Sequence, residues 1–336
     1  MSNNEQIDFL AIGDMVTDAF IRIEDAKVEK DKEKGIFNLC ISFGNKIPYK
    51  FVEVVRAVGN SPNASVSANR LGLNSHLVTD LGDDDEGEKC LKALEEEGVS
   101  TQFVTRHPDF ETNYHYVLWY EDERTILVKH QEYPYKFPEI ETPPKWIYLS
   151  SLAENSLPYH DSIAEYVKAN PDVKLVFQPG TFQMGLGYER LKEIYQLSEL
   201  FFCNVEEAKD IIGKKNEQIE INELLKMTRD LGPKKVVVTD GPKGAYTYDG
   251  EEMWFMPPYP DPKPPVDRTG AGDSFASTFT SALVLGKTIP EALEWAPINS
   301  MSVVQEIGAQ RGLLTREKLE EYLRNRPDDY HPQKVN

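Results

Sequence analysis

A glycine-rich turn that leads directly into an apolar helical repeat constrains this chain more than any other feature. The turn is Asp267-Arg268-Thr269-Gly270-Ala271-Gly272-Asp273, and the apolar residues after it recur at helical spacing as far as Leu285. Glycine permits backbone conformations and close approaches that a Cβ forbids. Free N–H groups and the positive dipole end at the start of a helix suit a phosphate or a developing anion. The pattern therefore predicts an anion site and a buried helix that begins near Asp273.

Asp273 itself stands at the mouth of this predicted anion site. A carboxylate in this place can cap the helix, or it can take a proton from a hydroxyl group beside the bound anion. The residues of the turn allow both roles.

The composition limits the partners of the protein. The 336 residues include 37 Lys or Arg and 56 Asp or Glu, for a formal net charge of −19. This charge argues against nucleic acid or an anionic membrane as partner, but it allows a small molecule. No run reaches the roughly 18 apolar residues of a membrane span. Met1–Asp8 lacks the apolar core of a signal peptide, so we expect a cytoplasmic protein.

The order of apolar runs indicates an α/β fold. From Trp146 onward, short apolar strands alternate with helical stretches, which is typical of a parallel sheet with crossover helices. Near the start, Ile7–Ile12 is a short apolar run that ends in Gly13 and Asp14, with Asp18 close behind. Ligands bind where buried parallel strands end. Asp14 and Asp18 are therefore either ligand contacts or solvated turn residues.

The segment Asp267–Phe275 resembles the carboxy-terminal signature D-T-x-G-A-G-D of the ribokinase-like (PfkB) carbohydrate kinases. Four further segments, spread over Ile7–Leu323, are similar to family motifs in the same order. The resemblance implies a three-layer sandwich with a central, mostly parallel sheet flanked by helices, and a small β-sheet lid. We expect the kinase domain at 1–326, lid segments near 15–56 and 103–132, and a polar C-terminal tail at 327–336.

The same resemblance assigns an acceptor site. Gly13 and Asp18 match a G-x-x-x-x-D pattern whose aspartate holds substrate hydroxyls, and Asp14 lies beside it. Gly59, Asn60 and Asn63 match a G-G-N-x-x-N motif that contacts the sugar, with Val58 in place of the first glycine. Asparagine amides both donate to and accept from hydroxyl groups. An Asn-rich turn that caps a helix is the alternative for this segment.

Nucleotide and metal contacts are also implied. Asn204 and Glu207 match an N-x-x-E motif whose side chains bind Mg²⁺ through water, although Asn followed by Glu three residues later is also an ordinary helix-capping pattern. The remaining matched positions are Thr239, Gly241 and Gly244 at the nucleotide phosphates, Asn299 facing the adenine, and Asp267, Thr269 and Gly308 around a monovalent cation such as K⁺. Gln178 and Arg268 depart from the family pattern.

The implied activity is ATP-dependent transfer of the γ-phosphoryl group to a hydroxyl of a small sugar. Asp273 would be the general base, and the backbone of Gly270, Ala271 and Gly272 would form the anion hole with it. Two alternatives stay open, namely a nucleoside kinase of the same fold and a non-catalytic sugar- or nucleotide-binding regulator. A homodimer through the lid is compatible with the sequence. A Walker-type site or a dinucleotide fold is not, because G-x-x-x-x-G-K-[ST] and the third fingerprint glycine are missing.

Overall fold

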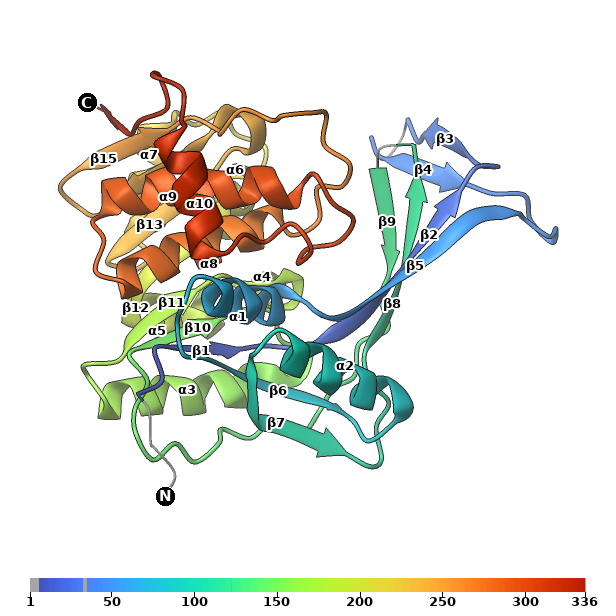
Figure 1. The fold of residues 1–336 in the computed structure, drawn as a ribbon, viewed down its shortest axis with the longest axis horizontal. Coiled ribbons are helices and arrows are strands. Elements are labelled where there is room, and N and C mark those ends of the chain that lie inside the picture. Colours follow the sequence, from blue (N-terminus) through green and yellow to red (C-terminus); the bar gives the residue numbers. More distant parts are fainter. Residues whose placement is uncertain (1–5, 33–34, 122, 336) are drawn as a thin grey trace.

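A ten-stranded sheet forms the centre of the computed structural model, which describes residues 6–32, 35–121 and 123–335 (Figure 1). In spatial order the strands are β16 (Gln333–Val335), β15 (Met253–Met256), β14 (Ala245–Tyr248), β13 (Lys235–Thr239), β12 (Ser198–Asn204), β11 (Lys174–Phe177), β10 (Trp146–Leu149), β1 (Phe9–Ile12), β6 (Ser75–Gly82) and β7 (Ser100–His107). The strands from β7 to β13 are parallel, and the last three at the β16 edge are antiparallel.

The parallel strands are apolar along their whole length because both faces of the sheet are covered. Every residue of β1 and of β10 is buried. Side chains alternate between the faces, so Phe9 and Ala11 belong to one core while Leu10 and Ile12 belong to the other. The result is a three-layer sandwich with two hydrophobic cores, as expected.

Helices pack on both faces of the sheet. One core includes residues of α1 (Asn60–Arg70), α2 (Asp85–Glu96), α8 (Ala271–Val284), α9 (Ile289–Val303) and α10 (Arg316–Arg324). The other includes residues of α3 (Leu157–Ala169), α4 (Thr181–Leu186), α5 (Tyr188–Leu197), α6 (Val205–Ile211) and α7 (Ile221–Arg229). Among the described residues, no helix combines the length and the apolar character that a membrane span requires.

A second, four-stranded sheet projects from the sandwich as the lid (Figure 1). Its strands are β5 (Tyr49–Val58), β2 (Val16–Ile23), β8 (Tyr114–Tyr120) and β9 (Glu123–Leu127), and a separate ribbon of β3 (Lys27–Lys30) and β4 (Phe37–Cys40) extends beyond it. The first predicted lid segment agrees with these strands. The second was placed too early, because residues 100–107 form β7 at the edge of the large sheet.

The prediction of a polar tail at 327–336 was wrong for the described residues of that segment. Strand β16 pairs antiparallel with β15 and so extends the large sheet. Tyr330 is buried and donates a hydrogen bond to the carbonyl of Glu294 (2.7 Å). The segment has a polar sequence because an edge strand of three residues buries little of its own surface. Its sequence therefore did not predict a strand.

Candidate functional site

The predicted anion turn lies at the start of helix α8. Gly270 is its N-cap and has a φ of 78°, a left-handed conformation that favours glycine. A Cβ on Gly270 would also collide with Ala309. Helix α8 begins at Ala271, two residues earlier than expected, so Asp273 lies in its first turn. No side chain caps this helix, which leaves the carboxylate of Asp273 available for another role.

Three side-chain amides hold the carboxylate of Asp273. Asn60 donates to Oδ1 (2.7 Å), Asn63 donates to Oδ2 (2.8 Å), and Gln178 donates to Oδ1 (3.2 Å). Burial raises the pKa of the Asp273 carboxyl, while the three amides lower it by stabilising the charged form. The carboxylate is therefore fixed in position, and it binds a proton more strongly than an ordinary aspartate does.

The two asparagines predicted to contact the substrate both donate to Asp273. Helix α1 begins at Asn60 without a side-chain cap, so the alternative of an Asn-rich cap does not hold. The Oδ1 of Asn63 accepts a hydrogen bond from Gln310 (3.0 Å). Gly59, with a φ of 123°, precedes the helix, and a Cβ there would lie 2.6 Å from the carbonyl oxygen of Asp14. The backbone of α1 thus packs directly against the end of β1.

Asp14 and Asp18 each face a histidine at the base of the lid. The carboxylate of Asp14 is buried and accepts hydrogen bonds from His130 (2.6 Å) and from the hydroxyl of Tyr135 (2.7 and 2.9 Å). The Nδ1 of His115 lies 3.4 Å from Oδ1 of Asp18. The two imidazole rings are 5.9 Å apart. This end of the site therefore combines carboxylates and imidazoles, which together both accept and donate hydrogen bonds.

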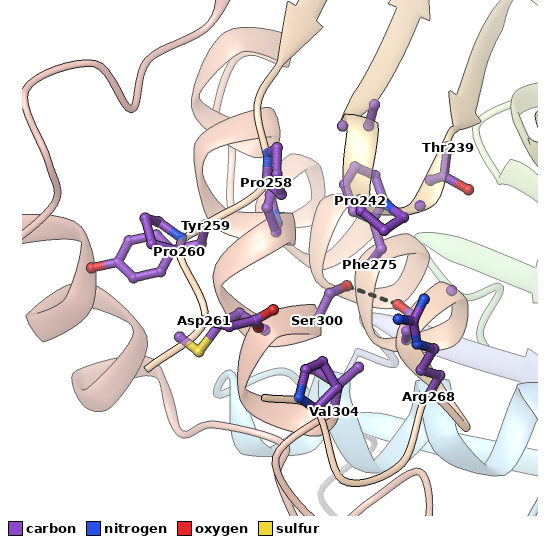
Figure 2. A pocket seen from close by; sticks show the side chains of 18 residues that line it. Thr239, Pro242, Pro258, Tyr259, Pro260, Asp261, Arg268, Phe275, Ser300 and Val304 are labelled. Carbon is purple, nitrogen blue, oxygen red and sulfur yellow. Dashed lines mark hydrogen bonds between the residues drawn. The ribbon is translucent and has the colours of Figure 1, made fainter. Parts of the chain in front are cut away.

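A cavity of about 570 Å³ opens on the other side of the anion turn (Figure 2). Ala271, Gly272 and Phe275 of α8 line it, as do Thr239, Gly241 and Gly244, the three residues predicted at the nucleotide phosphates. Ser300 of α9 also lines the cavity, and its hydroxyl donates to the carbonyl of Ala271 (2.7 Å). This volume is within the usual range for small-molecule sites.

The prediction that Asn299 faces the adenine was wrong. Its side chain is fully buried, donates to the hydroxyl of Thr278 (2.8 Å) and accepts from the N–H of Leu314 (2.9 Å). The neighbouring residues Ser300 and Met301 line the cavity instead. Because successive residues of a helix point about 100° apart, a displacement of one position changes the face on which a side chain lies.

Asn204 and Glu207 form a reciprocal cap at the start of helix α6. Asn204 accepts from the N–H of Glu207, and Glu207 accepts from the N–H of Asn204, both at 2.8 Å. Burial raises the pKa of the Glu207 carboxyl, and the negative charge of Asp273 raises it further. The capping alternative is confirmed. Among the described residues, no three His, Cys, Asp or Glu side chains are grouped as a metal site.

Asp267, Thr269 and Gly308 lie together, as the prediction of a monovalent-cation site requires. The buried carboxylate of Asp267 accepts from the N–H (2.9 Å) and hydroxyl (2.8 Å) of Thr269 and from the N–H of Gly308 (2.9 Å). It also forms an ion pair with Arg124 of lid strand β9, whose guanidinium donates to the hydroxyl of Thr269 as well. A side chain from the lid therefore meets the oxygens that were assigned to the cation.

The sequence of this chain matches a known family over most of its length. Residues 46–316 match the pfkB family of carbohydrate kinases. The chain belongs to this family. It is 25% identical over 319 residues to the ATP-dependent 6-phosphofructokinase of Thermoanaerobacterium thermosaccharolyticum, covering 91% of each chain. It is 28% identical over 273 residues to the ribokinase of Bacillus subtilis, covering 79% of this chain and 87% of that one.

The fold of this PfkB protein agrees with a solved structure of the ribokinase family. The nucleoside kinase of Methanocaldococcus jannaschii superimposes with a TM-score of 0.77 at 21% sequence identity, and the match covers 95% of this chain and 99% of that one. The ribokinase-like fold expected from the sequence is thereby confirmed.

Four residues of the site were absent from the sequence prediction of functional contacts. Gln178 was noted only as a departure from the PfkB pattern, and His115, His130 and Arg124 belong to no motif. The three last residues come from the lid or directly follow it, and they reach the site only because the lid folds against the sandwich. For His115 and His130, a polar side chain within a β-forming run was the available signal, whereas Arg124 ends a charged segment and gave no such signal.

Proposed function

We propose that this protein is an ATP-dependent kinase that phosphorylates a hydroxyl group of a small, unphosphorylated sugar, with Asp273 as general base. One observation carries the proposal. The carboxylate of Asp273 lies in the first turn of α8, whose Ala271 and Gly272 line the cavity of about 570 Å³. Three amides fix its position, one of them from Asn60, which follows the glycine that approaches Asp14. Membership of a carbohydrate kinase family and an ATP-dependent relative support the kinase activity and the phosphoryl donor, but not the choice of acceptor.

The chemical step divides between Asp273 and the backbone. Asp273 accepts the proton of the substrate hydroxyl, whose oxygen forms a bond to the γ-phosphorus. The bond between this phosphorus and the bridging oxygen breaks, and ADP leaves with the electron pair. The first N–H groups of α8 have no acceptor within the helix, so those at Gly270, Ala271, Gly272 and Asp273 are suited to the charge of the transferring group.

The nucleotide would bind in the cavity with its phosphates toward the anion turn. Thr239, Gly241 and Gly244 line the cavity, and the exposed side chain of Arg268 adds a positive charge there. Mg²⁺, when bound with the nucleotide, would neutralise phosphate oxygens. Asn204 and Glu207 would hold it through water, because oxygen ligands suit Mg²⁺ and the nearby negative charge of Asp273 would favour a cation.

The acceptor would bind at the opposite end. Asp14 and Asp18 accept hydrogen bonds from hydroxyl groups, and His115 and His130 add groups that donate or accept. A phosphate on the acceptor would be repelled by these carboxylates, which is why we favour an unphosphorylated sugar. The ring of Phe182 lies 5.4 Å from that of His130, and such a pair could stack on a base. A nucleoside is therefore the second candidate for the acceptor.

An ADP-release assay with ATP and Mg²⁺ against sugars, sugar phosphates and nucleosides tests the proposal. The matched pair of variants is Asp273→Asn and Asp172→Asn, the second at an exposed loop position. We expect the wild type to turn over with a sugar. Turnover should fall at least about 100-fold in Asp273→Asn, the usual scale for loss of a general base, and should stay normal in Asp172→Asn. Normal turnover in Asp273→Asn would exclude the base. Nucleotide binding without turnover of any acceptor would favour a regulator.

A further inference from the structure

Arg124 links the lid to the loop that precedes the anion turn. It lies on β9, which pairs antiparallel with β8, and its guanidinium contacts the carboxylate of Asp267 and the hydroxyl of Thr269. The exposed fractions of the Arg124 and Asp267 side chains are only 17% and 3%. A contact this well shielded from water is more than a surface ion pair.

Arg124 supplies the positive charge that Asp267 requires. A buried carboxylate is stable only when it is paired or fully hydrogen-bonded. Its other partners are the N–H and hydroxyl groups of Thr269 and the N–H of Gly308, which are neutral donors. Within residues 6–32, 35–121 and 123–335, Arg124 is the one cationic side chain that forms an ion pair with Asp267.

A monovalent cation does not fit these residues while the lid has this position. The predicted ion would take oxygens of Asp267 and Thr269 as ligands. The Asp267 carboxylate and the Thr269 hydroxyl already contact the guanidinium, whose positive charge would repel a second cation bound beside it. The prediction of a K⁺ site at Asp267, Thr269 and Gly308 therefore conflicts with the structure.

We infer that Arg124 is a positioning residue that takes the place of the monovalent cation, so that the lid itself orders the anion-hole loop. Asp267 connects Arg124 to Thr269, the residue before Gly270. Closing the lid therefore fixes the backbone at which the transferring group binds. A guanidinium stays charged at every working pH, so this contact requires no cation from solution. The inference rests on the proposed function only for its effect on turnover.

The charge of Arg268 makes this arrangement responsive to the nucleotide. Arg268 stands between Asp267 and Thr269 in the chain, the two residues that the Arg124 guanidinium contacts. The pKa of Arg124 is lowered by burial, and the positive charge of Arg268 lowers it as well. Arg268 lines the cavity proposed for the nucleotide. Because a nucleotide phosphate would reduce their mutual repulsion, nucleotide binding is expected to strengthen the contact between Arg124 and Asp267.

The first test measures thermal stability and ADP affinity, which do not require a known acceptor. Wild type, Arg124→Ala, Arg124→Gln and the control Lys129→Ala, which removes an exposed lid cation paired with Glu111, are compared at constant ionic strength in K⁺, Na⁺ and tetramethylammonium chloride. We expect wild type and Lys129→Ala to give the same values in all three salts. Both Arg124 variants should melt earlier and bind ADP more weakly in tetramethylammonium, and K⁺ should restore both properties. Two variants are used because Gln retains more of the packing if Ala fails to fold.

The second test measures turnover in the same salts once an acceptor is known. We expect kcat of the Arg124 variants to fall roughly 10- to 100-fold without K⁺, as for a misplaced catalytic group, and to recover with K⁺ or guanidinium ion. The inference is overturned if K⁺ stimulates wild type severalfold and the Arg124 variants keep that stimulation. If no acceptor is phosphorylated but K⁺ still restores ADP affinity in the variants, the proposed function fails and the role of Arg124 stands.

Discussion

Gln178 donates a hydrogen bond to Oδ1 of Asp273 across 3.2 Å, although 95 residues separate them in the chain. Its own Oε1 accepts from the hydroxyl of Tyr148, which is fully buried. The residue that departs from the family pattern after strand β11 is thus a direct partner of the proposed base. This contact lowers the pKa of Asp273, against the larger effect of burial, which raises it.

Replacing Gln178 should change the pH dependence of the reaction. Gln178 stabilises the charged form of Asp273, so Gln178→Leu should raise a carboxyl pKa that burial has already raised. Gln178→Asp should raise it more, because a second negative charge opposes ionisation. A general base works only when deprotonated, so the acid limb of kcat/KM should move to higher pH in both variants. The control is Gln102→Leu at an exposed position, which should leave the acid limb unchanged. An acid limb at the same pH in wild type and in both Gln178 variants would contradict this role.

The histidine at the lid base should affect the acceptor and not the nucleotide. His130 donates to the buried carboxylate of Asp14, so His130→Ala leaves that carboxylate with one fewer donor. We expect KM for the acceptor to rise roughly tenfold, the scale of a lost hydrogen bond to a charged group, with KM for ATP unchanged. Steady-state kinetics with each substrate varied in turn measures both. An increase confined to KM for ATP would show that this end is not the acceptor site.

Asn299 should contribute to stability and not to nucleotide binding. Asn299→Ala leaves the hydroxyl of Thr278 and the N–H of Leu314 without their partner. We expect a loss of about 1–3 kcal/mol in the free energy of unfolding, measured by urea titration, with ADP affinity unchanged. The control is Asn216→Ala at an exposed turn. Weaker ADP binding at unchanged stability would restore the contact with adenine that the sequence suggested.

The ribbon of β3 and β4 beyond the lid carries exposed apolar side chains at which the predicted homodimer can be tested. Phe43 is fully exposed, and Phe37 and Ile41, close to it in the chain, are more than half exposed. Exposed apolar patches often mark interaction surfaces. We expect sedimentation velocity to give a dimer for wild type and a monomer for the double variant Phe37→Ser, Phe43→Ser. A wild-type monomer across micromolar concentrations would exclude the lid dimer.

Much of the fold follows from local sequence signals. Short buried strands that alternate with amphipathic helices predicted the parallel sheet, because apolar periodicity is a local property of the chain. The same holds for the apolar run Ile7–Ile12, within which Phe9–Ile12 form β1. The two edge strands of the large sheet were harder to predict. Residues 100–107 and β16 contain few apolar side chains, so their own pattern does not indicate a strand. They belong to the sheet because they pair with a neighbouring strand.

The backbone features of the site could be predicted from the sequence, whereas the contacts between its side chains could not. Gly59 and Gly270 could be recognised because close approach and a positive φ exclude other residues at those positions. The side chains that meet Asp273, Asp14 and Asp267 depend on how α1, β11, the lid and α8 pack together. Such contacts span 95 residues or more and leave no regular spacing in the chain. Asn60 at Asp273 and Arg124 at Asp267 therefore became visible only in the folded protein.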